Sequence, residues 1–430
     1  MKRLRYLHLQ KMKELRVILQ GDLVSMDFLK SVSTKDVYEV LKNFIIRTDI
    51  EEINIEYAYN RVITHDVISK EDVPYFSRSL VDGYALKSKD TYGAKETNPR
   101  FVNVIGELKI GEISDLKIND GECIKVSTGS MIPEGADGVI MQEYTREMLN
   151  IIEITKVIHR GENICFKGDD IKKDEAVIEM GKRLDFFDMG ILASLGISKI
   201  EVYKKPKVSI ISTGDEIVDI NDHPKPGQIR DINRYVIKGL LSREGFVVRF
   251  SGIARDNLKE IMEKILLSGD GDIILISGGS SKGERDYIVE ALDKLGGEII
   301  FHGINIKPGK PTIFARLKDK PVFGLPGHPA SCSIVALRFV LPFLKKMEGE
   351  KLFLPQSAYM GILTSNVPSS LGIEEYVAVT SEKKFNKIFV TPIFTKSSLI
   401  STFTKAKGYI IVPEDNEGLE KDEIVEVFTF

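Results

Sequence analysis

The chain has 430 residues, of which 43% are hydrophobic and 29% are charged, values that are typical of a soluble globular protein. This length exceeds one ordinary hydrophobic core and predicts two to four domains. A net charge of −3 argues against nucleic acid as the main ligand, and no apolar stretch approaches the roughly 20 residues of a membrane-crossing helix. Cys123, Cys165 and Cys332 are far apart with no CxxC pair, which argues against disulfides or structural zinc and predicts a cytoplasmic protein.

The first 19 residues are strongly basic, with Glu14 as their single acid and leucines spaced between the basic residues. One interpretation is a basic amphipathic helix at a membrane surface. The other is an upstream start or a dispensable extension, with the working protein beginning at Met26. We expect residues 1–25 to be unnecessary for folding and activity.

The segments that follow differ in their predicted secondary structure. Residues 26–70 are predicted to be mostly helical, with Thr34 as the N-cap of a helix. From about 71 to 165, short alternating runs between turn signals predict a small inserted β domain. A second helix is predicted over 183–197, with Gly196 as its C-terminal stop.

From Pro206 onward the pattern becomes strand, loop and helix, which predicts an α/β domain with a parallel-type sheet over 205–347. The expected strands are 208–212, 272–277, 298–306 and 321–325. The expected helices are 255–267, a segment beginning at Tyr287, and 329–346. After Pro355, short alternating strands return and predict a small C-terminal β-barrel or sandwich.

Four loops in the α/β segment each follow an apolar run and are broken by glycine or proline. They are ISTGDEI (211–217), ISGGSSKGERDY (276–287), INIKPGKPT (304–312) and FGLPGHPAS (323–331). All but the third are expected to leave carboxyl ends of strands in one open sheet, where ligands of such folds bind. Their glycine amides, lysines and carboxylates suit a phosphorylated ligand that is held partly through a metal ion.

Two of these loops are candidate phosphate-binding sites. In the second loop, glycine amides turn toward an anion and the helix beginning near Asp286 adds its positive end. In the fourth, Gly327 precedes a helix that starts at Pro329, with Ser331 in its first turn. Each loop alone could be a plain strand-to-helix turn, but two on one edge favour a binding site.

The KPGKP sequence places Lys307 and Lys310 three residues apart, with Pro308 and Pro311 stiffening the backbone. Such fixed spacing of two ammonium groups fits an oxyanion clamp. The alternative is a solvated lysine turn.

Four acids fall at predicted loop-to-helix junctions: Asp215, Glu216, Asp256 and Asp286. Each could simply cap a helix. As a group beside phosphate-seating loops, they could hold Mg²⁺, which takes one or two carboxylates together with substrate oxygens. His328 is too isolated to indicate a zinc site, and no Ser/His/Asp order indicates a covalent nucleophile.

The ordered set of motifs resembles one known family. VDGYAL, TGSMIPEGADGVIMQE, RGENICFKGDDI, STGDEI, DINRY, SGGSSKGERDY, KPGKP and LPGHPAS occur in the order seen in molybdopterin molybdotransferases, the MoeA family, to which the gephyrin E domain also belongs. The resemblance runs from about Ser33 to the C-terminus.

This resemblance implies a four-part subunit that forms a homodimer. Its parts are an elongated helical dimerisation domain (26–70 and 166–204), an inserted β domain (71–165), a three-layer α/β domain that binds the pterin (205–347), and a C-terminal β-barrel-like domain (348–430). The implied reaction inserts molybdate or tungstate into adenylylated molybdopterin, with Mg²⁺-dependent release of AMP. The adenylyltransferase that supplies the substrate is an implied partner.

Two other functions stay open at this point. The same α/β domain occurs in molybdopterin adenylyltransferases, and a scaffold or cofactor carrier could keep the fold without turnover. The VDGYAL and TGS…PEGAD motifs and the additional domains favour metal insertion.

The resemblance assigns several residues to the cleft. The catalytic candidates are Asp82, Glu216, Asp256, Asp286, Lys307 and Lys310, and the metal candidates are Asp256, Asp286 and Glu216. The ligand-binding candidates are Thr128, Gly129, Asp170, Thr213, Gly278, Gly279, Ser280, Ser281, Gly283, Pro311, Gly327 and Ser331. Asp82 and Thr128 are expected to face the α/β domain of the partner chain.

The chain departs from the family pattern at four positions. His328 and Ala330 stand where the family usually has Asn and Val, and Ile373 and Ala378 lie near positions where many relatives carry arginine. These departures concern the contribution of the C-terminal domain to oxyanion binding.

Overall fold

The computed structural model describes residues 31–113, 115–278, 286–350, 354–394 and 398–430. The chain forms two compact units. The first unit comprises Met1–Ile45, Pro206–Leu344 and Phe353–Phe430, and the second comprises Ile46–Lys205 and Lys345–Leu352. The expectations for residues 1–25 lie outside the described residues. Across the described ranges, we find no helix with the length and apolar character needed to span a bilayer.

The first unit contains the predicted α/β sheet, which has six strands. Their order is β16 (Val247–Ala254), β13 (Lys207–Thr213), β17 (Ile273–Ser277), β21 (Lys320–Leu325), β20 (Ile313–Leu317) and β18 (Gly297–His302). The first four strands are parallel, whereas β20 runs antiparallel to both of its neighbours. The sheet is therefore mixed rather than purely parallel. Its central strand β17 is buried along its whole length, as its unbroken apolar sequence predicts.

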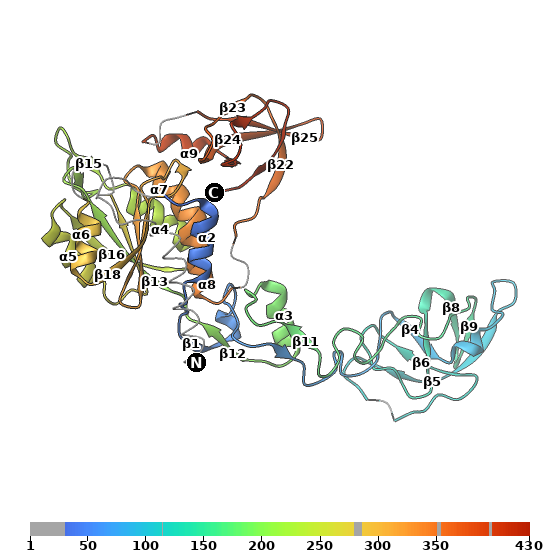
Figure 1. The fold of residues 1–430 in the computed structure, drawn as a ribbon. Helices are drawn as coiled ribbons and strands as arrows, with labels where there is room; N and C mark the ends of the chain where they lie inside the picture. Colours follow the sequence, from blue (N-terminus) through green and yellow to red (C-terminus); the bar gives the residue numbers. More distant parts are fainter. Residues whose placement is uncertain (1–30, 114, 279–285, 351–353, 395–397) are drawn as a thin grey trace. The chain divides into compact units, whose positions relative to one another are not determined.

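Helices cover both faces of this sheet (Figure 1). On one face, α5 (Leu258–Leu267) and α6 (Tyr287–Lys294) bury Ile261 and Leu292 in a core shared with the strands. On the other face lie α4 (Asn233–Arg243) and α7 (Pro329–Val335). The helix predicted over 329–346 is continuous, but a π-helical turn (Ala336–Val340) separates α7 from α8 (Leu341–Met347).

The N-terminal helix α2 (Thr34–Asn43) belongs to the same unit. Phe44, which follows it, packs edge-to-face against Phe314 of β20 and Phe343 of α8, with ring centroids 5.2 and 5.7 Å apart. The N-cap is Ser33 rather than the predicted Thr34, because the Ser33 Oγ accepts a hydrogen bond from the Asp36 amide. The structure thus moves the cap by one residue.

The strand predicted over 298–306 is divided between two sheets. β18 ends at His302, and Gly303, with φ of 102°, breaks the extended run. The chain then forms β19 (Ile306–Lys307), which pairs in parallel with β24 (Glu374–Lys384). The KPGKP loop therefore starts in the C-terminal sheet.

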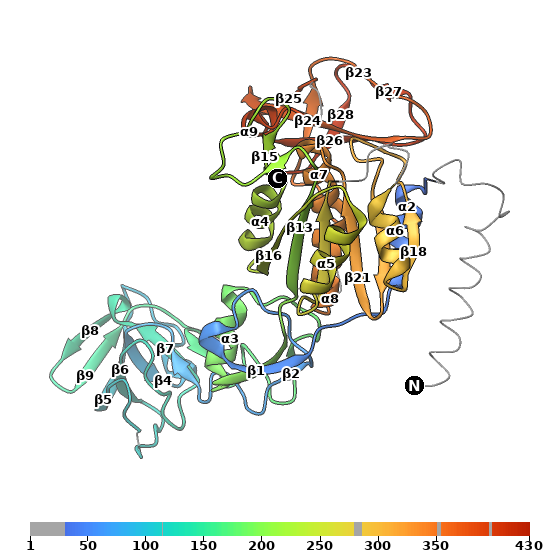
Figure 2. The ribbon, with the colours of Figure 1, turned by 90° about the vertical axis from the view of Figure 1, so that its left-hand side faces the viewer.

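The C-terminal sheet has the order β19, β24, β25 (Lys387–Pro392), β22 (Tyr359–Leu363) and β28 (Ile424–Val427), with β26 (Gly408–Val412) paired to the other part of β24. Alternating residues such as Val377, Val379 and Ile410 form its core. In both views, β24 and β26 lie close to α7 of the α/β part (Figure 2).

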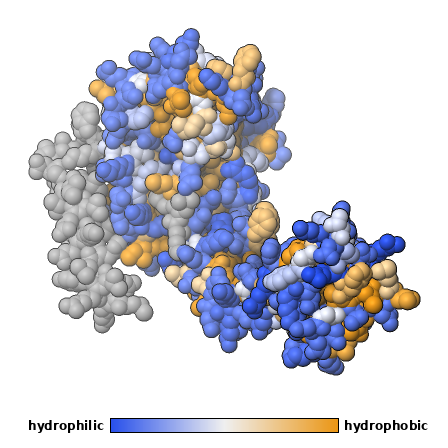
Figure 3. Space-filling view, turned by 90° about the vertical axis from the view of Figure 1, so that its right-hand side faces the viewer, coloured by the Kyte–Doolittle hydropathy of each residue, from blue (hydrophilic) through white to orange (hydrophobic). Residues whose placement is uncertain are grey.

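The second unit is mainly β. Its six-stranded sheet has the order β7 (Gly138–Met141), β4 (Gly83–Leu86), β6 (Glu122–Val126), β5 (Arg100–Leu108), β9 (Ile151–Ile154) and β8 (Thr145–Met148). Hydrophobic residues gather on part of the surface of this unit (Figure 3). Among the residues of the sheet and its turns, Phe101, Met148, Leu149 and Ile151 are exposed.

The rest of the second unit consists of strand pairs and one helix. The pairs are β1 (Ile50–Asn54) with β12 (Lys199–Tyr203), β2 (Val67–Ile68) with β11 (Ala176–Ile178), and β3 (Arg78–Ser79) with β10 (Ile164–Cys165). The prediction that 26–70 is mostly helical is wrong beyond Asn43, because the remainder alternates in exposure and pairs with distant segments. The second predicted helix is confirmed as α3 (Phe186–Ser194), capped by Asp185 and followed by Gly196 with φ of 66°.

Candidate functional site

Three of the four predicted loops meet at the carboxyl edge of the α/β sheet. A Cβ atom on Gly278, whose φ is 104°, would lie 2.1 Å from the carbonyl oxygen of Thr213. A Cβ atom on Gly327 would lie 3.7 Å from the Cα of Gly278, and the Gly278 amide donates to the carbonyl of Leu325 over 3.2 Å. The loops after β13, β17 and β21 are therefore packed backbone against backbone, and Gly278 has to be glycine.

Replacing Gly278 with alanine tests this packing. Because the new methyl group meets a backbone oxygen and the residue has positive φ, we expect a loss of about 1–3 kcal/mol in the free energy of unfolding, together with loss of activity. Gly239→Ala is the matched control, because Gly239 lies within α4 and its Cβ would meet open space. That variant should be stabilised by up to about 1 kcal/mol. Urea denaturation of both variants decides, and a Gly278→Ala protein as stable as wild type contradicts the packing argument.

Three buried polar side-chain atoms at this edge have no hydrogen-bond partner among the residues that the structure describes. They are Thr213 Oγ1 at the end of β13, Asn233 Oδ1 at the start of α4, and Asp256 Oδ1 just after β16. Buried polar atoms in folded proteins are nearly always hydrogen-bonded. This edge therefore presents three groups without hydrogen bonds in the described part of the chain, namely a hydroxyl, an amide oxygen and a carboxylate oxygen. Such a set fits a binding site that a polar ligand completes.

Asp256 does not cap a helix. Asn257 caps α5 instead, with its Oδ1 accepting from the Glu260 amide over 3.0 Å. The Asp256 amide donates to Asp215 Oδ1, and burial, together with the charges of Asp215 and Glu216, raises the pKa of the Asp256 carboxyl. An acid that is held in this way lowers its energy by gaining a cation.

The carboxylates fit Mg²⁺ bound jointly with a substrate better than a fully protein-made site. Among the residues that the structure describes, no three acidic, histidine or cysteine side chains stand close enough to hold a metal by themselves. Mg²⁺ commonly takes only one or two carboxylates and completes its shell with phosphate oxygens and water. Asp256 and Glu216 are the residues of this chain that would hold it.

Asp286 is engaged elsewhere. Its Oδ1 accepts from the amides of Ile288 and Val289 and so caps α6, while its Oδ2 lies 3.2 Å from His302 Nε2. These contacts place Asp286 with His302 rather than with Asp256 and Glu216. The predicted ligand residues Gly279, Ser280, Ser281 and Gly283 lie outside the described residues.

The KPGKP loop lines a pocket of about 430 Å³ that is shared by the α/β part and the C-terminal sheet. Lys307, Lys310, Pro311 and Ser331 all line it. Its other walls come from β24 and the segment around Phe394 and Phe403. The structure thus brings together the predicted clamp and the first turn of α7.

The two lysines of the clamp differ in their partners. Lys307 Nζ lies 2.8 Å from Glu375 Oε1, and Glu375 also accepts a hydrogen bond from Ser369. The Lys310 carbonyl accepts from the amides of Ile304 and Thr312, but its side chain has no hydrogen bond or ion pair with any residue in the described ranges, and the residue is exposed. An incoming anion would therefore find the charge of Lys310 uncompensated, whereas that of Lys307 is already balanced.

The departures from the family pattern fall partly in this pocket. Ala330 and Ala378 line it, so its wall is apolar at Ala378, which lies near a position where many relatives carry arginine. Ile373 is not among the lining residues, and His328 occupies the N-cap position of α7 without making a side-chain capping bond.

The second unit holds the remaining predicted site residues. Asp82 Oδ1 accepts from the amide of Thr128 over 2.7 Å and from its hydroxyl over 3.2 Å, and Gly129 follows with φ of 88°. Asp82 and Thr128 are both exposed. Asp170 is exposed in another loop, where its amide donates to the carbonyl of Val73. The VDGYAL and TGS motifs are therefore one bonded pair, to which Asp170 is not joined.

Two residues of the site were missed from the sequence. Asn233 joins two of the edge loops, and Glu375 balances Lys307. The DINRY motif contains Asn233 and was available as a signal. Nothing local indicated Glu375, because its pairing depends on how β19 and β24 meet.

Taken together, the fold and site define a multidomain α/β protein with a glycine-rich strand edge and a lysine-lined pocket, both of which suit anionic ligands. Comparison with known families makes this specific. Residues 32–196 match the MoeA N-terminal region (domain I and II), 209–346 match a family described as a probable molybdopterin binding domain, and 360–430 match the MoeA C-terminal region (domain IV). The chain therefore belongs to the MoeA family and is a transferase of molybdenum cofactor biosynthesis.

Individual relatives extend over nearly the whole chain. A Methanocaldococcus jannaschii protein whose name refers to molybdopterin biosynthesis is 36% identical, over 93% of this chain and 97% of its own length. The molybdopterin molybdenumtransferase of Haemophilus influenzae is 31% identical, over 91% of this chain and 96% of its own. A crystal structure of the molybdopterin biosynthesis MoeA protein from Pyrococcus horikoshii has 31% identity and a TM-score of 0.82, covering 93% of this chain and 100% of that one. The resemblance drawn from the motifs is confirmed.

Proposed function

We propose that this protein inserts molybdate or tungstate into adenylylated molybdopterin, with Mg²⁺-dependent release of AMP, as a homodimer in the cytoplasm. The observation that carries the proposal is that one loop serves both candidate sites. Gly327 packs on the edge loop at Gly278, and Ser331, one helical turn further on, lines the pocket with Lys310. One helical turn spans about 5 Å, so a single substrate could reach both places.

In this proposal the chain supplies orientation and charge. The amides of the edge loops would hold the phosphates of the substrate, and Lys310 would hold the oxyanion near the pterin dithiolene. Asp256 and Glu216 would hold Mg²⁺, which supplies neutralisation of phosphate charge when it is bound. The dithiolene sulfurs belong to the substrate and provide the metal-binding chemistry.

A product assay separates this function from its alternatives. Purified adenylylated molybdopterin with Mg²⁺ should yield AMP only when molybdate or tungstate is added. Accumulation of adenylylated molybdopterin from molybdopterin and ATP would instead indicate an adenylyltransferase. Tight binding without turnover under both conditions would indicate a carrier.

The finer fold description is part of the proposal. A barrel-like C-terminal domain is supported by hydrogen bonds in both directions between Tyr409 of β26 and Phe428, just beyond β28. These bonds connect the two ends of the series β26, β24, β25, β22 and β28. A sheet that returns to its first strand leaves fewer open edges.

A dimer contact through α3 is supported by its exposed apolar residues. Phe186 and Phe187 are 66% and 73% exposed, although their rings lie 4.4 Å apart and form one surface. Exposed paired aromatic side chains beside small residues such as Gly190 and Ala193 are typical of protein contact surfaces. We therefore assign this face of α3 to the dimer interface.

A shared active site makes a testable prediction for the dimer. Thr128→Ala and Lys310→Ala proteins should each be inactive, but their mixture should recover roughly a quarter of wild-type activity, because half of the dimers are hybrids with one intact cleft each. Activity of the mixed proteins measures this, with subunit exchange verified by differently tagged chains. Complete exchange without any recovery would place Thr128 and Lys310 in the same subunit's site or in different sites.

A further inference from the structure

Asn233 presents a buried hydrogen-bond acceptor at the carboxyl edge of the α/β sheet. The residue is 8% exposed, and its Nδ2 donates to Ser277 Oγ and to the carbonyl oxygen of Gly327, both over 2.8 Å. A carbonyl oxygen can only accept, so Gly327 fixes which end of the amide carries the hydrogens. The other end, Oδ1, is consequently an acceptor, and it is buried without a partner in the described ranges.

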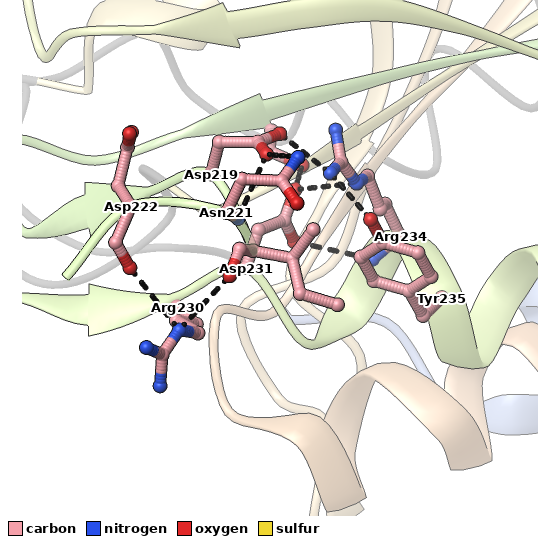
Figure 4. Close-up of polar contacts among 9 residues, drawn as sticks. Asp219, Asn221, Asp222, Arg230, Asp231, Arg234 and Tyr235 are labelled. Carbon is pink, nitrogen blue, oxygen red and sulfur yellow. Dashed lines mark hydrogen bonds and ion pairs between the residues drawn. The ribbon is translucent and has the colours of Figure 1, made fainter. Parts of the chain in front are cut away.

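The residues on either side of Asn233 in the chain, Asp231 and Arg234, belong to a polar network (Figure 4). Asp231 Oδ2 accepts from Ser212 Oγ over 2.6 Å, and its Oδ1 accepts from the Arg234 amide. Arg234 in turn donates to Asp219 Oδ2 over 2.7 Å, and its guanidinium lies 4.1 Å from the ring centroid of Phe250. The start of α4 is thus tied to β13, β16 and the loop at Asp219. With its backbone held in this way, Asn233 cannot turn its acceptor toward another donor without breaking the bonds from its Nδ2 to Ser277 and Gly327.

The chemistry of Oδ1 differs from that of the rest of the edge. Glycine amides and lysines donate hydrogen bonds and therefore suit phosphate oxygens. The side-chain oxygen of Asn233 is itself an acceptor, so phosphate oxygens repel it. A phosphate would therefore leave this atom unsatisfied. An N–H or O–H group on the organic part of a ligand would satisfy it.

We propose that Asn233 is a specificity-determining residue whose Oδ1 accepts a hydrogen bond from an N–H or O–H group of the organic ligand that lies across Gly278 and Gly327. Naming that ligand as adenylylated molybdopterin rests on the proposed function. The acceptor role rests on the geometry of Asn233 alone.

Binding measurements with three probes test the inference. Adenylylated molybdopterin and AMP carry N–H and O–H donors, while pyrophosphate presents mainly acceptor oxygens. In Mg²⁺-free buffer, Asn233→Ala should weaken binding of at least one organic probe by about 10-fold or more. Its affinity for pyrophosphate should change by less than about 3-fold. Isothermal titration calorimetry provides the dissociation constants.

Ser277→Ala is the matched control. It removes one of the two groups that anchor the Asn233 amide but leaves Oδ1 and the Gly327 contact. Its effects on the organic probes and on pyrophosphate should be small and parallel. Asn233→Leu keeps the side-chain volume and provides the same comparison if Asn233→Ala melts at a much lower temperature.

Three outcomes overturn the inference. An equal loss for organic probes and pyrophosphate means that Asn233 only holds the loops together. Unchanged binding of every probe means that Asn233 touches no ligand. A wild-type protein that binds neither organic probe leads to the same conclusion. If the wild-type protein binds AMP but not adenylylated molybdopterin, the proposed function is contradicted. The effect of Asn233→Ala on the affinity for AMP then decides the role of Asn233.

Discussion

Replacing Lys310 with alanine is expected to weaken the use of molybdate or tungstate by about 10- to 150-fold while leaving the stability of the fold nearly unchanged. Lys310 lines the pocket with Ser331 and is exposed, and its ammonium group has no partner in the described part of the chain. Its removal would therefore cost no existing contact but would leave the bound oxyanion uncompensated. The oxyanion concentration dependence of AMP release measures the effect.

Lys307→Ala provides the comparison within the same loop. Because Glu375 already balances Lys307, and the Lys307 side chain is 64% exposed, we expect a change of less than about 1 kcal/mol in stability and a smaller effect on oxyanion use than for Lys310→Ala. Lys310→Arg tests shape, since a planar guanidinium does not replace a compact ammonium in a tight turn. If the Lys310→Ala protein keeps the wild-type dependence on oxyanion concentration, the clamp is contradicted and KPGKP is only a rigid surface turn.

Asp256→Asn is expected to abolish activity and to raise the melting temperature. The wild-type carboxylate is partly buried near Asp215 and Glu216, with one oxygen unpartnered, so its charge destabilises the ligand-free fold. An amide removes this charge at nearly the same size. Activity should fall by about 100-fold or more, since the group that would hold Mg²⁺ is lost.

The stabilisation by Asp256→Asn should depend on pH. A carboxyl whose pKa is raised in the folded state binds its proton more tightly there, so wild-type stability falls as pH rises from the unfolded-state pKa of Asp through the raised value. The variant lacks this titration. The difference in melting temperature should therefore be small in acid and grow toward neutral pH. A constant difference across this range, or a lower melting temperature at neutral pH, contradicts the assignment.

The edge loops and most α/β elements could be predicted because their signals are local. Apolar runs of β13 and β17, followed by glycine turns, report both the strand and the place where it ends. Gly278 shows why the signal is reliable, since the close approach of Thr213 excludes any other residue there. Once the strands are taken to be parallel, Gly278 and Gly327, which follow two of them, are expected to lie at the same edge of the sheet.

Other features depend on long-range pairing and could not be read from local pattern. The run over 298–306 is rich in isoleucine on both sides of Gly303. Only pairing with distant strands decides that Ile306 joins the sheet of β24 rather than that of β18. The segment after Asn43 has residues that suit either helix or strand, and its pairing with β12 decides for strand. Asp256 and Asn257 are equally good capping residues in sequence, so the choice of cap could not be predicted either.

The way in which the chain is divided between the two units has a consequence for biosynthesis. Phe44 emerges from the ribosome early but completes its aromatic cluster only when Phe314 and Phe343 follow. The second unit is nearly continuous, yet it too awaits a late segment, because Arg183 pairs with the buried Glu348. Each unit therefore closes only after a segment that lies far along the chain from its start. Nascent chains carry both cores partly open for most of translation, and this is when they are most exposed to aggregation and to chaperones.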